Sequence, residues 1–146
     1  MYNIYMALEN IIVRPYQLTD YHDVKQILIE ANMYYEEMYS EERLDEKIRR
    51  DKKSILIAEV KGKVVGNIFF DIDWFPIIFG LAVKSEYRNK GIGKKLVDAI
   101  IAEGKTKGFK SMELLVRENR IKLQNTYEHW GFIKGNVYRW MTREIK

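Results

Sequence analysis

The stretch Gly80–Gly93 reads GLAVKSEYRNKGIG, and it joins an apolar segment to an amphipathic one through a loop rich in glycine and basic residues. Its first part, Leu81-Ala82-Val83, is typical of the end of a buried strand. The residues after Gly93 predict a helix that opens at this glycine, because their apolar members recur at helical spacing. These members are Leu96, Val97, Ile100 and Ile101.

The loop of this stretch has the composition of an anion site. A helix N-terminus carries unpaired backbone N–H groups and a partial positive charge, so an anion is favoured there. Gly91 and Gly93 allow a ligand to approach the backbone closely. Mobile countercharge comes from Arg88, Lys90, Lys94 and Lys95. The alternative is a strand-to-helix turn whose basic face is merely solvated.

The spacing Arg88-x-x-Gly91-x-Gly93 separates this loop from two other phosphate-binding motifs. It lacks the Lys-Ser/Thr ending of a nucleotide P-loop and the third glycine of a dinucleotide fingerprint. It resembles the acetyl-CoA loop of the GCN5-related N-acetyltransferase (GNAT) superfamily, in which Gln/Arg-x-x-Gly-x-Gly/Ala follows a strand. The resemblance extends to Tyr127 and Gly131-Phe132 downstream and to the Val13-Arg14-Pro15 opening, so it covers most of the chain.

This resemblance implies acetyl-CoA as the cosubstrate, direct transfer to an amine, and no metal. The strand end would bind the pantetheine arm through Leu81, Ala82 and Val83. The pyrophosphate would be surrounded by Arg88, Asn89, Lys90, Gly91, Ile92, Gly93 and Lys94. Family members carry an asparagine seven residues before their catalytic tyrosine, where this chain has Arg120. The neighbouring Asn119 either replaces it at the cofactor or caps the following helix.

Tyr127 is the candidate catalytic residue. Its position before Gly131-Phe132 matches the tyrosine that protonates the leaving thiolate in the family. A phenol has a pKa of about 10, so it is protonated at neutral pH and can act as the acid. The alternative is a tyrosine packed on an apolar helix stripe. The base that takes the amine proton stays open. The candidates are Glu36, Glu37, Asp71, Asp73 and ordered water, with His22 and His129 as weaker ones.

Length and composition indicate one cytoplasmic domain over residues 1–146. A chain of 146 residues can bury a core without a metal or disulfide, and it contains no cysteine. The N-terminus does not read as a signal peptide, and no stretch is apolar enough to cross a membrane. Basic residues interleaved with stacking aromatics, which would indicate nucleic acid, are not evident.

The two halves of the chain carry opposite charge. Residues 1–83 hold 10 Lys+Arg against 14 Asp+Glu, a net −4, and residues 84–146 hold 15 against 7, a net +8. A polyphosphate cosubstrate suits the basic half, and a cationic primary amine of a small molecule or peptide suits the acidic half. Tyr34, Tyr35 and Trp74 are candidate walls for that amine.

The order of predicted elements is β-α-α-β-β-β-α-β-α-β-β. Strands are expected at 11–14, 55–60, 64–70, 77–83 and 112–116, followed by Phe132-Ile133 and 137–145. This pattern predicts an α+β fold with a mixed, mostly antiparallel central sheet flanked by helices, as in GNAT domains. We therefore expect an N-acetyltransferase, with a non-catalytic acyl-CoA-binding regulatory domain as the alternative and a homodimer compatible with either.

Overall fold

The chain forms two compact units, Met1–Leu114 and Leu115–Lys146. The structure is a computed structural model that describes residues 10–73 and 75–146. None of the described helices is long and apolar enough to cross a membrane. Because the whole sheet lies in the first unit, that unit carries the core and most of the candidate site. A single domain over residues 1–146 stays a prediction.

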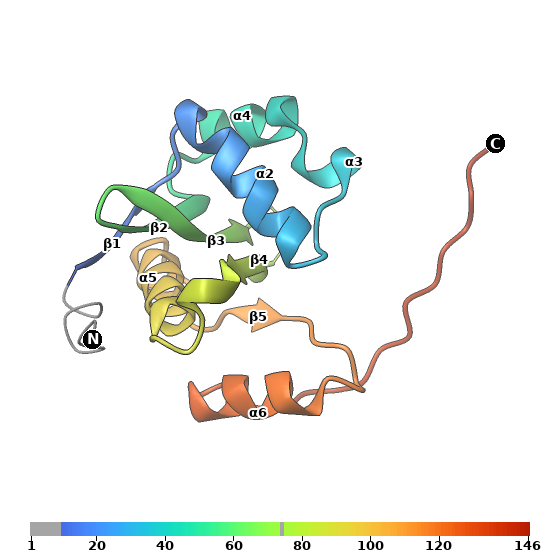
Figure 1. The fold of residues 1–146 in the computed structure, drawn as a ribbon. Coiled ribbons are helices and arrows are strands. Elements are labelled where there is room, and N and C mark those ends of the chain that lie inside the picture. Colours follow the sequence, from blue (N-terminus) through green and yellow to red (C-terminus); the bar gives the residue numbers. More distant parts are fainter. Residues whose placement is uncertain (1–9, 74) are drawn as a thin grey trace. The chain divides into compact units, whose positions relative to one another are not determined.

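A five-stranded mixed sheet in the order β1-β2-β3-β4-β5 forms the centre of the first unit (Figure 1). The first four strands pair antiparallel, and β5 pairs parallel with β4. The sequence-based prediction of an α+β fold with a mixed, mostly antiparallel sheet is therefore confirmed. The strands are β1 (Ile11–Pro15), β2 (Ile55–Val60), β3 (Lys63–Asp71), β4 (Ile77–Val83) and β5 (Glu113–Leu114).

Helices cover both faces of this sheet. Figure 1 shows α2 (Tyr21–Glu30), α3 (Glu36–Tyr39) and α4 (Glu41–Arg50) on one face and α5 (Ile92–Thr106) on the other. The second unit contains α6 (Ile121–His129). The crossover from β4 through α5 to β5 produces a parallel pair, as a strand-helix-strand order implies.

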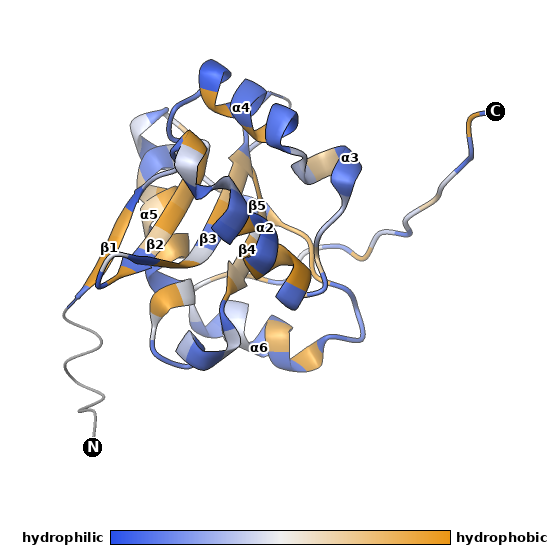
Figure 2. Cartoon of the chain, turned by 45° about the horizontal axis from the view of Figure 1, so that its top comes forward, coloured by the Kyte–Doolittle hydropathy of each residue, from blue (hydrophilic) through white to orange (hydrophobic). Residues whose placement is uncertain are grey.

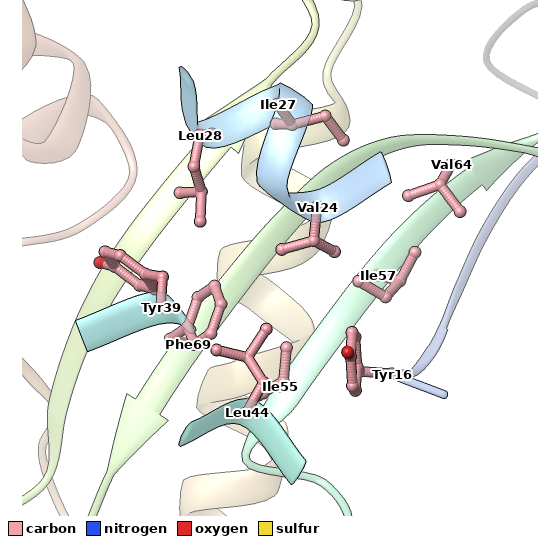
Figure 3. Close-up of a cluster of buried hydrophobic side chains, with 11 residues drawn as sticks. Tyr16, Val24, Ile27, Leu28, Tyr39, Leu44, Ile55, Ile57, Val64 and Phe69 are labelled. Carbon is pink, nitrogen blue, oxygen red and sulfur yellow. The ribbon is translucent and has the colours of Figure 1, made fainter. Parts of the chain in front are cut away.

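The core between α2 and the sheet follows from helical periodicity. Val24, Ile27 and Leu28 form the buried stripe of α2, and they point at the apolar residues of β2 and β3 (Figure 3). Tyr39 and Leu44 complete this cluster from α3 and α4. Figure 2 shows apolar colour along β2 and β3 and mostly hydrophilic colour over α4, as expected of a helix with one buried stripe.

Two sequence-based predictions near the C-terminus are wrong. Residues 130–146 contain no strand, although Phe132-Ile133 and 137–145 were expected to form a hairpin. An alternating apolar pattern shows only which side chains would share a face. A strand also needs backbone hydrogen bonds to a neighbouring strand. Ile133, Val137 and Trp140 are 93%, 72% and 86% exposed.

The predicted cap of α6 is also wrong. The N-cap is Arg120, and Asn119 lies in the preceding turn, which the hydrogen bond from Arg120 N–H to Arg117 O closes at 3.0 Å. The expectation that Asn119 contacts the cosubstrate stays a prediction.

Candidate functional site

The site begins with a β-bulge in β4. Asn67 pairs with Ala82 and Phe69 with Phe79, so Gly80 and Leu81 stand opposite Ile68 alone. Gly80 has φ +62°, and its carbonyl accepts a hydrogen bond of 2.8 Å from the amide nitrogen of the buried Asn67. A Cβ at Gly80 would lie 2.6 Å from Cδ2 of Phe69, so this position requires glycine both for its backbone angle and for its close approach.

The bulge determines which edge the end of β4 presents. Lys84 N–H donates to Val65 O at 2.8 Å, so this residue faces β3. Alternate residues direct their backbone groups to opposite edges, which turns those of Leu81 and Val83 away from β3. On that side β5 pairs with Ile77 and Ile78 and then ends. The far end of β4 therefore presents an edge with no paired strand among the described residues.

The three predicted pantetheine residues are thus not equivalent. Leu81 and Val83 direct backbone groups to the open edge, as an extended amide-containing ligand would require. Ala82 is 5% exposed, belongs to the core cluster, and has its backbone facing β3. A contact between Ala82 and the pantetheine arm stays a prediction. In the structure, Ala82 packs in the core between Leu81 and Val83.

The loop after β4 folds back onto this edge. Arg88 donates from Nε to Val83 O at 2.9 Å, so the loop is attached to the strand end. The Lys90 ammonium donates to Glu86 O at 3.1 Å and lies 5.3 Å from the centre of the Tyr87 ring. The Arg88 contact holds one basic side chain at the strand end, and the Lys90 contacts keep a second one within the loop.

The loop ends in an uncapped helix N-terminus. Asn89 and Gly91 have φ +60° and +82°, and Gly91 is the N-cap of α5, which starts at Ile92. The first intrahelical bond runs from Lys95 N–H to Gly91 O at 3.1 Å. The preceding N–H groups, of Ile92, Gly93 and Lys94, have no acceptor within the helix. Left-handed residues beside free N–H groups form a cradle for a phosphate oxygen, so the residues present fit a pyrophosphate.

Glu30 secures the start of the loop from another element. It is the last residue of α2, and one of its carboxylate oxygens accepts a 2.6 Å hydrogen bond from Ser85 N–H. Hydrogen bonds from Ser85 lower the pKa of this carboxyl group, so it stays ionised at neutral pH. The helix α2 and the anion loop are therefore connected directly.

Tyr127 lies in the second unit and packs among aromatic rings. Its ring centre is 5.6 Å from that of Trp130 and 5.5 Å from that of Phe132, both in edge-to-face geometry. Burial raises the pKa of Tyr127 above its usual value, so the phenol is protonated across the physiological range. Gly131 ends the helix at φ +94°, as predicted.

The predicted acceptor residues divide into two groups. Glu37, Asp71 and Asp73 line one cleft of the first unit, together with side chains of α4. Glu36 is instead hydrogen-bonded by the hydroxyl of Tyr34. Tyr35 is 58% exposed, and Trp74 lies outside the described residues.

Sequence reasoning missed the importance of several residues. Gly80 begins the motif, and a lone glycine inside a strand pattern is itself a signal for a bulge. The roles of Asn67 and Glu30 depend on contacts with distant segments, so the local sequence carries no signal for them.

Comparisons with known proteins agree with this geometry. A model of the acetyltransferase (GNAT) family matches residues 21–132. A protein of Archaeoglobus fulgidus, named as an uncharacterized N-acetyltransferase, is 31% identical over 88 residues, which are 55% of this chain and 60% of that protein. Ard1 from Thermoplasma volcanium has a similar solved structure, with a TM-score of 0.75 and 23% identity over 87% of this chain and 85% of that chain.

A further solved structure contains coenzyme A. It is the PaiA N-acetyltransferase from Thermoplasma acidophilum in complex with coenzyme A, with a TM-score of 0.70 and 25% identity over 82% of this chain and 87% of that chain. The family model alone spans well over half of the sequence. The chain therefore belongs to the acetyltransferase (GNAT) family.

Proposed function

We propose that this GNAT N-acetyltransferase transfers an acetyl group from acetyl-CoA to a cationic primary amine of a small molecule or peptide. The observation that carries the proposal is the uncapped N-terminus of α5, with Gly91 in the left-handed conformation, beside the unpaired end of β4. A strand edge and an anion cradle joined by one short loop match a ligand that has an amide-containing arm and a pyrophosphate.

The proposed roles in the first unit follow from this arrangement. Leu81 and Val83 hydrogen-bond the pantetheine arm through their backbone groups. The free N–H groups of Ile92, Gly93 and Lys94 bind the pyrophosphate, and the guanidinium of Arg88 adds positive charge. Asn89, Lys90 and Gly91 shape the cradle. Most of these contacts come from the backbone, so the loop acts as a unit.

The proposed chemistry is a direct transfer. The acceptor nitrogen, having lost its proton, attacks the thioester carbonyl, the C–N bond forms and the C–S bond breaks. Tyr127 donates its phenolic proton to the departing thiolate. The chain supplies this acid in its protonated state because burial keeps the pKa of Tyr127 high.

The acceptor side is proposed to be the acidic half of the chain. Residues 1–83 carry a net −4, and Glu37, Asp71 and Asp73 gather around one cleft there. Carboxylates attract a protonated amine, and one of them, or a water molecule that it holds, can remove the proton that must leave before the attack.

Two glycines at opposite ends of α5 provide a matched test of the cofactor site. Gly91 has φ +82° and Gly108 has φ +89°, so an alanine at either position carries a similar backbone cost. A Cβ at Gly108 would meet no atom within 4 Å. Calorimetric titration with acetyl-CoA should show at least about tenfold weaker binding for Gly91→Ala and wild-type affinity for Gly108→Ala. Equal affinities in both folded variants would refute the cofactor assignment.

The activity itself is tested with a panel of amines and labelled acetyl-CoA. Acetylated product is expected from cationic amines, with neutral and acidic amines slower. Tight acetyl-CoA binding without any acetylated product would contradict the proposal and favour a regulatory acyl-CoA-binding domain.

A further inference from the structure

The first unit contains a cleft that the cofactor site does not use. It has a volume of about 360 Å³, within the range of small-molecule sites, and lies between α3, α4, the turn after β3 and the start of β4. Its apolar surface comes from Met38, Phe70, Ile72 and Phe79. Its charged lining comes from Glu37, Arg43, Glu46, Lys47, Arg50, Asp51, Asp71 and Asp73.

The charges of this cleft are unevenly paired. Asp51 is bound by Lys107 at 3.0 Å and Glu46 by Arg50 at 2.8 Å, so these two carboxylates are satisfied. Asp71 accepts a 3.0 Å hydrogen bond from Asp73 N–H, and its ion pair with Lys47 is long, at 3.9 Å. Asp73 lies 3.5 Å from Arg50, which is also a long contact. Five carboxylates against three basic side chains leave the lining with a net charge of −2.

Lys47 shows how an ammonium group sits in this cleft. Its Nζ lies 5.4 Å from the centre of the Phe79 ring and faces Asp71 across the cleft. An ammonium placed between an aromatic face and a carboxylate is stabilised by both. Burial partly desolvates the ammonium group and so lowers the pKa of Lys47. A ligand ammonium group bound here would contact the same ring and the carboxylates of Asp71 and Asp73, whose ion pairs within the chain are long.

The cleft is close to the point at which the acetyl group is expected. Phe79 forms part of its wall, and Leu81, which begins the open edge of β4, is two residues further along the strand. Two residues of a regular strand span about 6.6 Å, which is an upper bound here because Gly80 lies in a bulge. One end of a short alkyl diamine can therefore lie in the cleft while the other end reaches that edge.

We propose that this cleft binds the second ammonium group of a diamine or polyamine acceptor, with Asp71 and Asp73 as the countercharge and Phe79 as the aromatic wall. The inference rests on the proposed acetyl transfer and adds to it a second binding point on the acceptor. With Asp71 and Asp73 engaged by this second ammonium group, Glu37 or a water molecule takes the proton of the reacting nitrogen. Lys47 competes with the ligand for Asp71, so removing its charge strengthens the site. Recognition by charge thus predicts that removing the charge of Asp71 weakens binding of the second ammonium group, whereas removing the charge of Lys47 strengthens it.

The first experiment compares acceptors with the same five-carbon chain. The last carbon of this chain carries a second ammonium group in cadaverine and only hydrogen in pentylamine. For the wild-type chain, kcat/KM for cadaverine should exceed that for pentylamine by about tenfold, because two carboxylates near one ammonium each contribute roughly fivefold or less in a hydrated cleft.

Three variants separate charge from structural damage. The double substitution of Asp71→Asn and Asp73→Asn should reduce the preference for cadaverine over pentylamine to nearly one. Lys47→Met keeps the alkyl stem over Phe79 and should increase the preference. Glu42→Gln removes an exposed carboxylate of α4, the helix that carries Lys47. Glu42 does not line the cleft, so this control should keep the wild-type preference for cadaverine.

A binding measurement gives a readout that does not depend on turnover. Calorimetric titration of spermidine without acetyl-CoA should show binding that weakens with salt, is lost in the double asparagine variant and is tighter in Lys47→Met. Equal kcat/KM for cadaverine and pentylamine would overturn the cleft proposal while the acetyltransferase assignment stands. So would a change of spermidine affinity in the same direction in the double asparagine variant and in Lys47→Met. Tighter binding of a dicarboxylate than of spermidine would also overturn it. Absence of acetylation with every amine would instead contradict the proposed function.

Discussion

Replacing Gly80 with alanine should both destabilise the chain and weaken the cofactor site. A non-glycine residue in the left-handed region costs about 1–2 kcal/mol, and Gly80 has φ +62°. The new Cβ would lie 2.6 Å from Cδ2 of Phe69, whose side chain is 1% exposed. Its ring cannot move freely, because its centre is 5.1 Å from that of Tyr39 and 5.5 Å from that of Phe79.

The size of the effect follows from these two causes. Overpacking of a rigid core costs about 1–3 kcal/mol, so the free energy of unfolding should fall by about 3 kcal/mol in total. This corresponds to a decrease in Tm of roughly 9 °C for a chain of this size. Urea denaturation followed by circular dichroism measures the first quantity, and a thermal scan measures the second.

Gly62→Ala is the matched control. Gly62 also has a positive φ, +78°, but a Cβ there would meet no atom within 4 Å. Its loss should therefore be about 1 kcal/mol, from the backbone alone. Acetyl-CoA affinity, measured well below both Tm values, should fall for Gly80→Ala and stay unchanged for Gly62→Ala, because only the first change disturbs the bulge that turns Leu81 and Val83 outward.

A double-mutant cycle with Phe69→Leu identifies the contact responsible. The smaller side chain relieves the clash, so the two substitutions together should cost clearly less than their separate effects combined. If Gly80→Ala is no more destabilising than Gly62→Ala, or if the two effects in the cycle are additive, the close approach of Gly80 to the Phe69 ring does not determine the bulge.

Three further predictions concern the acid, the ion pair and the core. Tyr127→Phe should lower kcat by about 10²- to 10⁴-fold with acetyl-CoA affinity intact; an unchanged kcat would mean that the ring only packs. Although burial opposes ionisation of Asp20, hydrogen bonds from Arg14 at 2.7 and 2.9 Å keep its pKa below the usual value. The resulting stability is present above the unfolded-state pKa of about 3.9 and is lost as the pH falls through the lower folded-state pKa. Asp20→Asn should therefore abolish that part of the acid dependence in urea titrations. Leu44→Ala, at a side chain 1% exposed, should cost about 3 kcal/mol in the same assay, and a loss under about 1 kcal/mol would show that α4 is only loosely packed.

Sequence reasoning was most successful where the physics is local. The strand over residues 77–83 and the glycine-rich helix start follow from periodicity and glycine chemistry, and both occur in the structure within a residue or two of the prediction. The parallel pairing of β4 and β5 follows from a strand-helix-strand order. Family resemblance then supplied the roles of the anion loop and Tyr127, which remain proposals.

The tertiary structure decided everything that depends on a distant partner. The alternating pattern at 137–145 predicts a strand, but it provides no partner strand for backbone hydrogen bonds. The segment is exposed and contains no strand. The bulge at Gly80 depends on Phe69 and on the Asn67 amide, and the cleft depends on Lys47 of α4 meeting Asp71 at the end of β3. Periodicity and capping report the preferences of a few neighbouring residues, whereas a bulge, an ion pair or a cleft exists only after folding has brought segments far apart in the sequence into contact.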